Sequence, residues 1–430
     1  MNSNEIFVSL DIGTSTVKVI IGEMVNDVLN IIGVGNVKSE GIRKGSVVDI
    51  DETVQSIQKA IEQAERMVGM EIKQVIVGIA GNHAMLQPCN GVVAVSSENK
   101  EITDDDVARV MDACQVISIP QDREIINIIP KQFIVDGLDE INDPRGMIGV
   151  RLEMEGILIT GLKTMLHNTL RCVERAGLEI TEIVFQPLAA GTVALSKDEK
   201  NLGSALIDIG GGSTTVTVFE HGFIKAATVL PVGGDHLTKD LSIGLRTSTE
   251  DAEKIKVKHG HAYYDYASED EVFSVPIIGS DQHQQYSQVE LSEIIEPRLE
   301  EIFDLVHYEL NRLGIRDLPG GIVLTGGVAN IQGILELAQE MFQNSVRVAI
   351  PDYIGVREPQ YTTAIGLIQF AYKSARLQGR KVSAVPEPVM AQEVRTQKEQ
   401  QPNQKAKPEK KPEDKFTSKV KRFFGYFFDE

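Results

Sequence analysis

The sequence is poor in the features that mark secreted, metal-binding and nucleic-acid-binding proteins. Its three cysteines, Cys89, Cys114 and Cys172, are widely spaced and form no C-x-x-C pair, so neither a disulfide framework nor a zinc site is expected. The formal net charge of −19 supplies no basic field for a phosphate backbone, which argues against nucleic-acid binding. No apolar run reaches transmembrane length, and the first residues do not resemble a signal peptide. We therefore expect a protein of a reducing cytosol that is neither secreted nor membrane-spanning.

The chain also lacks the G-x-x-x-x-G-K-[ST] motif of P-loop proteins, but it contains two copies of another glycine pattern. The copies read LDIGTSTVKV, which includes Asp11, and IDIGGGSTTVTV, which includes Asp208. Each predicts a strand ending near an aspartate, a tight turn and a second strand, which together form a β-hairpin. Glycines let backbone N–H groups approach an anion without a Cβ clash, and the hydroxyl residues add donors. An ordinary hairpin with a glycine-rich turn is the alternative for either copy alone.

The repetition favours phosphate binding by both hairpins. The two aspartates are separated by the length of a domain, which suits the duplication of a whole lobe rather than a short repeat. Two similar lobes could each place one hairpin at a shared cleft. There Asp208 could orient a hydrated Mg²⁺, a cation that needs only one or two carboxylates. With 430 residues and 42% apolar content, the chain can bury two or more cores.

Other segments rich in glycine and alanine extend the predicted site. In QPLAAG, Gln186 could orient an attacking water, or the segment could be a connector whose alanines permit close helix packing. In VLPVGGDHLTKDLS, Gly233 and Gly234 precede a predicted helix. In GGIVLTGGVANIQG, Gly326 and Gly327 lie between a strand and a helix, where they would admit a flat base or ribose. A plain strand-to-helix turn is the alternative for the last segment.

Two helices between these glycine segments carry start signals and charges. Asp235 could cap the first helix, and Thr247 with Glu250 forms a plausible capping box for the second. Glu253 and Lys254 in the second helix could face an adenine or ribose. A solvated charged face is the default explanation for such a run.

The first lobe alternates strands and helices, which indicates an α/β structure. Apolar residues from Ile57 to Ala64 recur at helical spacing, and Gly69 lies where that helix would end. From about His83 to Gly161 the pattern changes to strands and a helix capped by Thr103, which predicts a compact α+β insertion. The insertion contains NDPRGMIGVRLE and no catalytic cluster, so it is expected to be a scaffold or an interaction surface.

The last part of the chain changes composition twice. After about Val382 it is rich in Pro, Gln, Lys and Glu, which is typical of a disordered linker. The sequence FTSKVKRFFGYFFDE then predicts an amphipathic helix suited to the plane of an anionic membrane, because apolar residues share one face and basic residues flank it. A recognition helix that docks into a partner's groove is the alternative. The residues assigned to the membrane are Phe416, Val420, Phe423, Phe424, Phe427, Phe428, Lys419, Lys421 and Arg422.

Both hairpins, the QPLAAG connector and the LTGG turn resemble the phosphate 1, connect 1, phosphate 2 and adenosine motifs of the actin, sugar kinase and Hsp70 superfamily. Within it, NDPRGMIGVRLE and the absence of an earlier insertion resemble the FtsA family of bacterial cell-division proteins, over about residues 5–380 and in the tail. The resemblance implies an α/β, actin-like two-lobed ATPase fold that binds ATP with Mg²⁺ between the lobes. Several relatives carry Glu at the connector where this chain has Gln, so at most weak ATP hydrolysis is expected.

The resemblance also assigns residues by position. Asp11 and Asp208 would take catalytic places and hold Mg²⁺ through water, and Gln186 would position the attacking water. The cofactor-binding residues that it implies are Asp11, Gly13, Thr14, Ser15, Lys18, Asp208, Gly210, Gly211, Gly212, Ser213, Thr214, Gly233, Gly234, Glu253, Lys254, Gly326, Gly327 and Val328.

The implied domains alternate along the chain. Residues 1–82 and 163–196 would form the core of the first lobe, with 83–162 inserted as an α+β interaction subdomain. Residues 197–235 and 315–382 would form the core of the second lobe, with 236–314 as its smaller subdomain. A disordered linker, 383–415, would precede the amphipathic helix, 416–430.

The function implied by the family is to polymerise at the cytoplasmic face of the cell membrane, at the division septum. There the chain would anchor the ring of the tubulin-like protein FtsZ and help to recruit later division proteins through the inserted subdomain. Its partners would be the FtsZ C-terminal tail, with Arg298 as a candidate contact, further copies of itself and an anionic membrane surface. A small-molecule kinase and an Hsp70-type chaperone are the alternatives. The 47 residues after Ser383 are too few and too polar for a chaperone's peptide-binding domain.

Overall fold

The structure is a computed structural model that describes residues 5–280, 282–377 and 379. The predicted linker and amphipathic helix, including every residue assigned to the membrane, lie outside these ranges. Within them, no helix is both long enough and apolar enough to cross a bilayer.

The first sheet contains the predicted N-terminal hairpin. Its strand order is β11-β6-β1-β2-β3, in which β1, β2 and β3 are antiparallel and β6 and β11 run parallel to β1. The strands are β1 (Glu5–Ile12), β2 (Thr16–Val25), β3 (Val28–Lys38), β6 (Gln74–Ile79) and β11 (Glu179–Phe185).

The second sheet repeats this arrangement around the second predicted hairpin. Its order is β18-β17-β12-β13-β14, with β12, β13 and β14 antiparallel and β17 and β18 parallel to β12. The strands are β12 (Ser204–Ile209), β13 (Thr214–Glu220), β14 (Phe223–Leu230), β17 (Ile322–Thr325) and β18 (Val346–Val348). Because order and direction agree strand by strand, the topology carries the duplication that the two sequence patterns indicate.

Helix α1 (Ile50–Val68) covers the first sheet and ends where its sequence predicts. The Asp49 side chain accepts a hydrogen bond from the Glu52 N–H at 3.0 Å, and Gly69 ends the helix with φ of 71°. The predicted apolar stripe, including Ile57 and Ala60, is fully buried. Caps at both ends and one apolar face together fix the limits of this helix.

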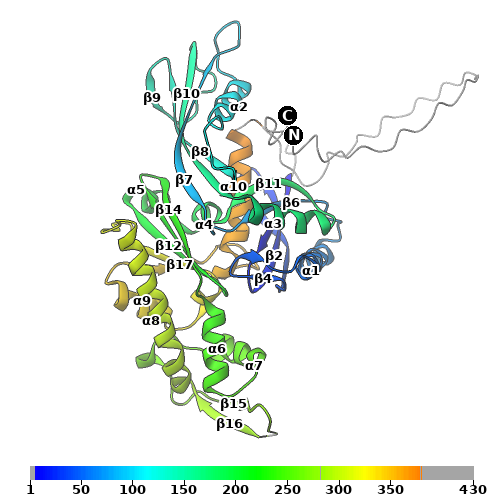
Figure 1. Ribbon diagram of the computed structural model, residues 1–430, viewed down its shortest axis with the longest axis vertical. Coiled ribbons are helices and arrows are strands. Elements are labelled where there is room, and N and C mark those ends of the chain that lie inside the picture. Colours follow the sequence, from blue (N-terminus) through cyan, green and yellow to red (C-terminus); the bar gives the residue numbers. More distant parts are fainter. Residues whose placement is uncertain (1–4, 281, 378, 380–430) are drawn as a thin grey trace, which may run out of the picture. The chain divides into compact units, whose positions relative to one another are not determined.

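Helix α10 (Thr362–Leu377) packs against the first sheet and against α4 (Gln186–Ala194) (orange and green in Figure 1). Gly366 permits this approach, because a Cβ there would lie 1.9 Å from the Ala189 carbonyl oxygen. The buried side chains of α10 share a core with Phe7 and Ile20 of the first sheet. This packing differs from the prediction, which placed all of 315–382 in the second-lobe core, because α10 is apolar enough to be buried from two sides.

The inserted segment forms its own sheet of order β7-β10-β8-β9, with α2 against it. Its elements are β7 (Met85–Ala94), α2 (Asp104–Ala113), β8 (Arg123–Val135), β9 (Leu138–Ile141) and β10 (Arg151–Leu162). Thr103 begins α2 as predicted, with its N–H and hydroxyl both donating to Asp106 at 2.9 Å. Phe133, Leu152 and Met154 belong to a core separate from those of the two larger sheets. The insertion is therefore an α+β unit with its own interior.

Polar side chains hold the base of the insertion together and connect it to the first lobe. The Arg123 guanidinium is buried and donates to the carbonyl oxygens of His83, at 2.5 Å, and Thr160, at 2.8 Å. Asn127 donates to the Ile183 carbonyl and accepts from the Phe185 N–H at 2.7 Å, so its amide pairs with strand β11. These bonds satisfy backbone groups that would otherwise be buried without partners.

A further tie runs from the insertion to the end of α10. Arg145, in the NDPRGMIGVRLE segment, donates to Asp104 and Asp143 and also to the Arg376 carbonyl oxygen at 3.0 Å. The arginine therefore joins the insertion to the last turn of α10.

The smaller part of the second lobe is helical. Long helix α8 runs through Pro297 without a break and buries one apolar face, which includes Leu299 and Phe303. Its elements are α6 (Gly234–Gly244), α7 (Thr249–His259), β15 (Val272–Pro276), β16 (His283–Ser287) and α8 (Gln288–Arg312). Helices α5 (Lys197–Leu202) and α9 (Ile334–Phe342) contact the second sheet, and α3 (Lys163–Arg175) belongs to the first lobe.

Two predicted helix starts are wrong by one or two residues. Gly233, not Asp235, precedes α6, and Asp235 lies in its first turn. Ser248, not Thr247, caps α7 by accepting from the Asp251 N–H at 3.0 Å. The pairs Thr247 with Glu250 and Ser248 with Asp251 both have the S/T-x-x-D/E spacing of a helix start. The Thr247 N–H is bonded to the Ser242 carbonyl, and the helix begins after Ser248.

Candidate functional site

The two hairpin tips have the same local geometry. The Gly13 N–H donates to the Thr16 carbonyl and the Gly210 N–H to the Ser213 carbonyl, each at 3.0 Å. In both hairpins the aspartate is the next-to-last residue of the first strand, opposite Lys18 in one and opposite Thr215 in the other. The two predicted phosphate loops are therefore copies in structure as well as in sequence.

The two tips touch each other. Ser15 donates from its hydroxyl to an Asp235 carboxylate oxygen at 2.9 Å. A Cβ on Gly211 would lie 1.7 Å from the Ser15 hydroxyl oxygen, and one on Gly212 would lie 2.4 Å from the Thr14 methyl group. Glycine is therefore required where the tips meet, and a phosphate group can enter between them only when they move apart.

Two carboxylates lie behind these tips, Asp11 buried and Asp208 half-buried. Asp11 lies 3.9 Å from the Lys18 ammonium and accepts from the Gln186 amide nitrogen at 2.7 Å. Asp208 accepts from the Thr363 hydroxyl at 3.2 Å. Burial and the neighbouring Asp11 charge raise the pKa of Asp208 to about 6. Burial also raises the pKa of Asp11, although Lys18 and Gln186 oppose this effect. Two carboxylates with raised pKa values favour a cation beside them.

No group of three or more His, Cys, Asp or Glu side chains converges in the part of the chain that the structure describes. A cation at Asp11 and Asp208 would therefore take most of its ligands from water and a bound anion. This donor set suits Mg²⁺, which retains several waters.

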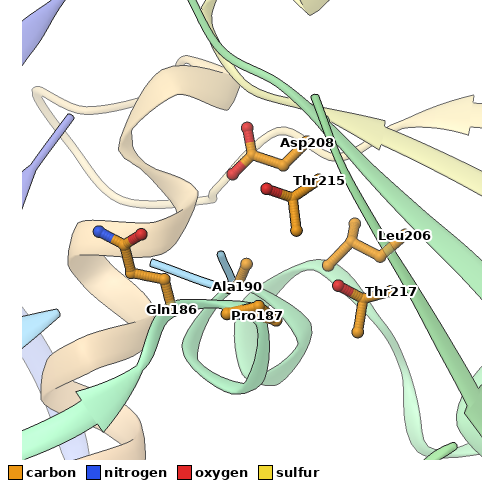
Figure 2. Close-up of a pocket in the computed structure, with 8 residues that line it drawn as sticks. Gln186, Pro187, Ala190, Leu206, Asp208, Thr215 and Thr217 are labelled. Carbon is orange, nitrogen blue, oxygen red and sulfur yellow. The ribbon is translucent and has the colours of Figure 1, made fainter. Parts of the chain in front are cut away.

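A small pocket lies beside these carboxylates (Figure 2). Gln186, at the start of α4, lies across from Asp208 and Thr215 of the second sheet. The pocket holds about 20 Å³, which is room for one water molecule. Because the Gln186 amide nitrogen is bonded to Asp11, its oxygen is the atom that could accept a hydrogen bond from such a water. The lining residues are Gly81, Gln186, Pro187, Ala190, Leu206, Asp208, Thr215 and Thr217.

The predicted adenosine segment adjoins the second hairpin. Gly326 has φ of 91°, and a Cβ there would lie 2.4 Å from an Asp208 carboxylate oxygen, so this glycine lets the LTGG turn pass behind the carboxylate. A Cβ on Gly327 would meet no atom within 4 Å, so that side of the turn is open. Val328 lies against Gly234, where a Cβ would be 2.8 Å from the valine methyl group. The two pairs of glycines that the sequence predicts in the site are thus brought together.

Helix α7 supplies a residue that the sequence reasoning missed. The buried Lys256 ammonium donates to the Gly234 carbonyl at 3.1 Å and to Glu253 at 2.6 Å. Lys254, predicted with Glu253 to face an adenine or ribose, pairs with Glu250 and Asp251 and is exposed. Residues three apart share a helix face, so the E-x-x-K spacing was the signal that identifies Lys256.

The predicted partner contact Arg298 is already engaged. Its guanidinium makes two bonds to Asp240, at 2.6 and 3.1 Å, and also pairs with Glu301. An acidic partner would have to compete with Asp240 for this arginine.

Two five-stranded sheets of the same topology, each with a glycine hairpin, define an actin-like fold. The PilM-PilN type IV pilus biogenesis complex has a chain similar in structure, with a TM-score of 0.57, 16% identity and coverage of 84% of this chain and 97% of that one. MreB5 of Spiroplasma citri bound to ADP gives a TM-score of 0.54, 15% identity and coverage of 86% and 98%. At these identities the likeness shows the fold alone.

The family follows from sequence similarity. Three family descriptions match: Cell division protein FtsA at residues 205–366, SHS2 domain inserted in FTSA at 81–160, and Cell division protein FtsA, C-terminal at 371–429. The cell division protein FtsA of Bacillus subtilis (strain 168) is 59% identical over 441 aligned residues, which cover all of both chains. The chain belongs to the FtsA family, as its motifs predict.

Proposed function

We propose that this chain binds ATP with Mg²⁺ between its two hairpins and uses the nucleotide to set the separation of its lobes. The observation that carries the proposal is the meeting of two equivalent glycine hairpins over two carboxylates with raised pKa values, Asp11 and Asp208. Backbone N–H groups and hydroxyls at both tips suit phosphates, and the carboxylates suit a hydrated cation.

The chain's own residues have separate roles in this proposal. Gly13, Thr14 and Ser15 would bind phosphate from one side, and the residues from Gly210 to Thr214 from the other. Bound Mg²⁺ would supply positive charge beside the phosphates. Gln186 would orient a water in the adjoining pocket but cannot take its proton, because an amide is not a base, so hydrolysis would be slow.

The contact between the tips gives the nucleotide a mechanical effect. Because Ser15 touches Gly211 and Thr14 touches Gly212, phosphates that enter there hold the tips apart. The nucleotide would thus fix one lobe separation, and a fixed separation favours repeated contacts between copies in a filament.

The wider role rests on the family and on the tail sequence. The chain would polymerise at the cytoplasmic face of the cell membrane, at the septum, and anchor FtsZ there by binding its C-terminal tail. The residues from Phe416 would enter the membrane surface, and a row of weak anchors along a filament would add avidity. The insertion would be the surface for later division proteins.

Calorimetric titration of the full-length chain with ATP, with and without Mg²⁺, tests the nucleotide half of the proposal. We expect Mg²⁺-dependent binding that weakens at least tenfold in Asp11→Asn, while the exposed Asp317→Asn control binds as the wild type. The absence of Mg²⁺-dependent binding by the wild type would refute the proposal.

Sedimentation with anionic liposomes tests the membrane half. The full-length chain should pellet, more so with ATP and Mg²⁺, and a version truncated before Phe416 should stay in solution. Equal pelleting of both would show that the tail is not the anchor.

A further inference from the structure

The segment after β3 lies along the first hairpin tip. The Ser39 N–H donates to the Ser15 carbonyl at 2.9 Å, and the Gly45 N–H donates to the Thr14 hydroxyl at 3.1 Å. Thr14 is therefore held between Gly45 on one side and Gly212 of the second hairpin on the other. The segment borders the gap that phosphates would enter.

At Gly45 this segment makes a tight and well-anchored turn. Strands β4 (Ile42–Arg43) and β5 (Ser46–Val47) pair antiparallel, with Arg43 opposite Ser46. The two residues between them, Lys44 and Gly45, have φ of 49° and 73°, the left-handed pair that a two-residue hairpin turn requires. Asn82 donates to the Lys44 carbonyl at 2.6 Å, so the turn is tied on its other side as well.

Lysine is an unusual choice for this turn. Asn, Asp and Gly are the residues that adopt left-handed backbone readily, and a long side chain there carries a conformational cost. Such cost is found mostly where a side chain has a function. The positive charges of Arg43 and Lys44 are therefore not explained by the turn that holds them.

These two charges are also uncommitted, unlike two other lysines of the site. Lys18 faces Asp11, and Lys256 is bonded to Glu253 at 2.6 Å. Arg43 and Lys44 are exposed and have no ion-pair partner among the residues that the structure describes. A triphosphate that enters beside two carboxylates needs positive charge beyond one Mg²⁺, and this turn supplies it.

We infer that Arg43 and Lys44 bind the terminal phosphate of the nucleotide and so distinguish ATP from ADP. The inference rests on the proposed ATP site and deepens it. The turn lies where the terminal phosphate would enter. Its backbone is bonded to Thr14, at the point where the two hairpin tips meet.

Binding titrations of ATP and ADP with Mg²⁺ test this inference without any measure of turnover. The variants are Arg43→Ala and Lys44→Asn; asparagine removes the charge but suits the left-handed backbone, so the turn is kept. Lys59→Ala, at an exposed position on α1, is the matched control. Unchanged urea unfolding midpoints verify that the variants fold.

Each variant should weaken ATP binding about tenfold, the usual effect of losing one charge-assisted contact, and ADP binding less than threefold. The Lys59 control should bind both as the wild type does. If the wild type binds nucleotide and the variants lose ATP and ADP equally or not at all, the inference is wrong while the ATP site stands. If the wild type binds neither nucleotide, the proposed function fails and the inference fails with it.

Discussion

Replacing Asp208 with asparagine should stabilise the ligand-free protein above pH 6. Asp208 is half-buried beside the Asp11 carboxylate, and loss of water contact together with the Asp11 charge raises its pKa from the ordinary 3.8 to about 6. A raised pKa means that the folded state holds the proton more tightly than the unfolded state. Ionised Asp208 therefore destabilises the fold, and asparagine removes that charge with almost no change in shape.

The magnitude follows from the two pKa values. Each pKa step is worth 1.36 kcal/mol, so a rise from 3.8 to about 6 corresponds to about 3 kcal/mol of lost stability when Asp208 is fully ionised. For a group with a raised pKa, this loss is absent below the unfolded value and complete above the folded value. The stability advantage of Asp208→Asn should thus be near zero at pH 3, grow between about pH 4 and pH 6, and stay constant up to pH 8.

Urea unfolding of the two proteins without nucleotide, at pH 4 and pH 8, measures this difference. The advantage of the variant should increase by about 2 kcal/mol over that interval. The exposed Asp317→Asn variant is the control and should show no comparable pH dependence. A variant less stable than the wild type at pH 8, or an equal advantage at both pH values, would refute the electrostatic reasoning. The same variant should bind Mg²⁺ with ATP more weakly.

Three further substitutions test how the fold is held together. Gly366→Ala should cost about 3 kcal/mol in urea unfolding, because the new Cβ would lie 1.9 Å from the Ala189 carbonyl oxygen. Asp106→Ala should cost about 2 kcal/mol in the same assay, because the buried carboxylate, with its pKa lowered to about 2 by hydrogen bonds, anchors the start of α2. Asn127→Ala should speed hydrogen exchange of the Phe185 N–H at least tenfold, because the Asn127 side chain accepts that N–H at 2.7 Å.

Each of these substitutions has a matched control in the chain. Gly327→Ala should leave stability unchanged, because its Cβ would meet no atom within 4 Å. Asp105→Ala, at an exposed neighbour of Asp106, should cost less than about 1 kcal/mol. Asn30→Ala, at an exposed position on β3, should not affect exchange at Phe185. Equal effects of a substitution and its control would contradict the contact assigned to it.

The local elements of the fold could be predicted because their signals are local. Each hairpin is encoded by an aspartate at a strand end, a glycine turn and alternating apolar residues, and the structure forms both as antiparallel pairs. Helix α1 carries its own cap, apolar stripe and terminal glycine. The repetition of one pattern in two places then made the doubled architecture predictable, because a repeated sequence folds into a repeated structure.

Other features depend on residues far apart in the sequence and could not be predicted from single segments. The E-x-x-K spacing indicates the pair of Lys256 with Glu253, but its bond to the Gly234 carbonyl could not be predicted, because Gly234 lies on another helix. The packing of α10 on the first sheet depends on the close approach of Gly366 to Ala189, which no periodicity reveals. The contact of Ser15 with Gly211 shows that this glycine lets the two hairpin tips approach one another, which the hairpin sequences do not indicate.

The equivalence of the two sheets has a consequence for the origin of the site. Helices α4 and α10 each follow the last strand of their own sheet, and they pack against each other. When two copies of a half-length unit meet through the same helix, the contact is isologous: the same surface of each copy is used. A residue near the two-fold axis of such a contact faces its own copy. Asp11 and Asp208 are such a pair. On this view the repulsion between them was inherited from a symmetric dimer, and the later differences, lysine opposite one aspartate and threonine opposite the other, made the two halves of the site unequal.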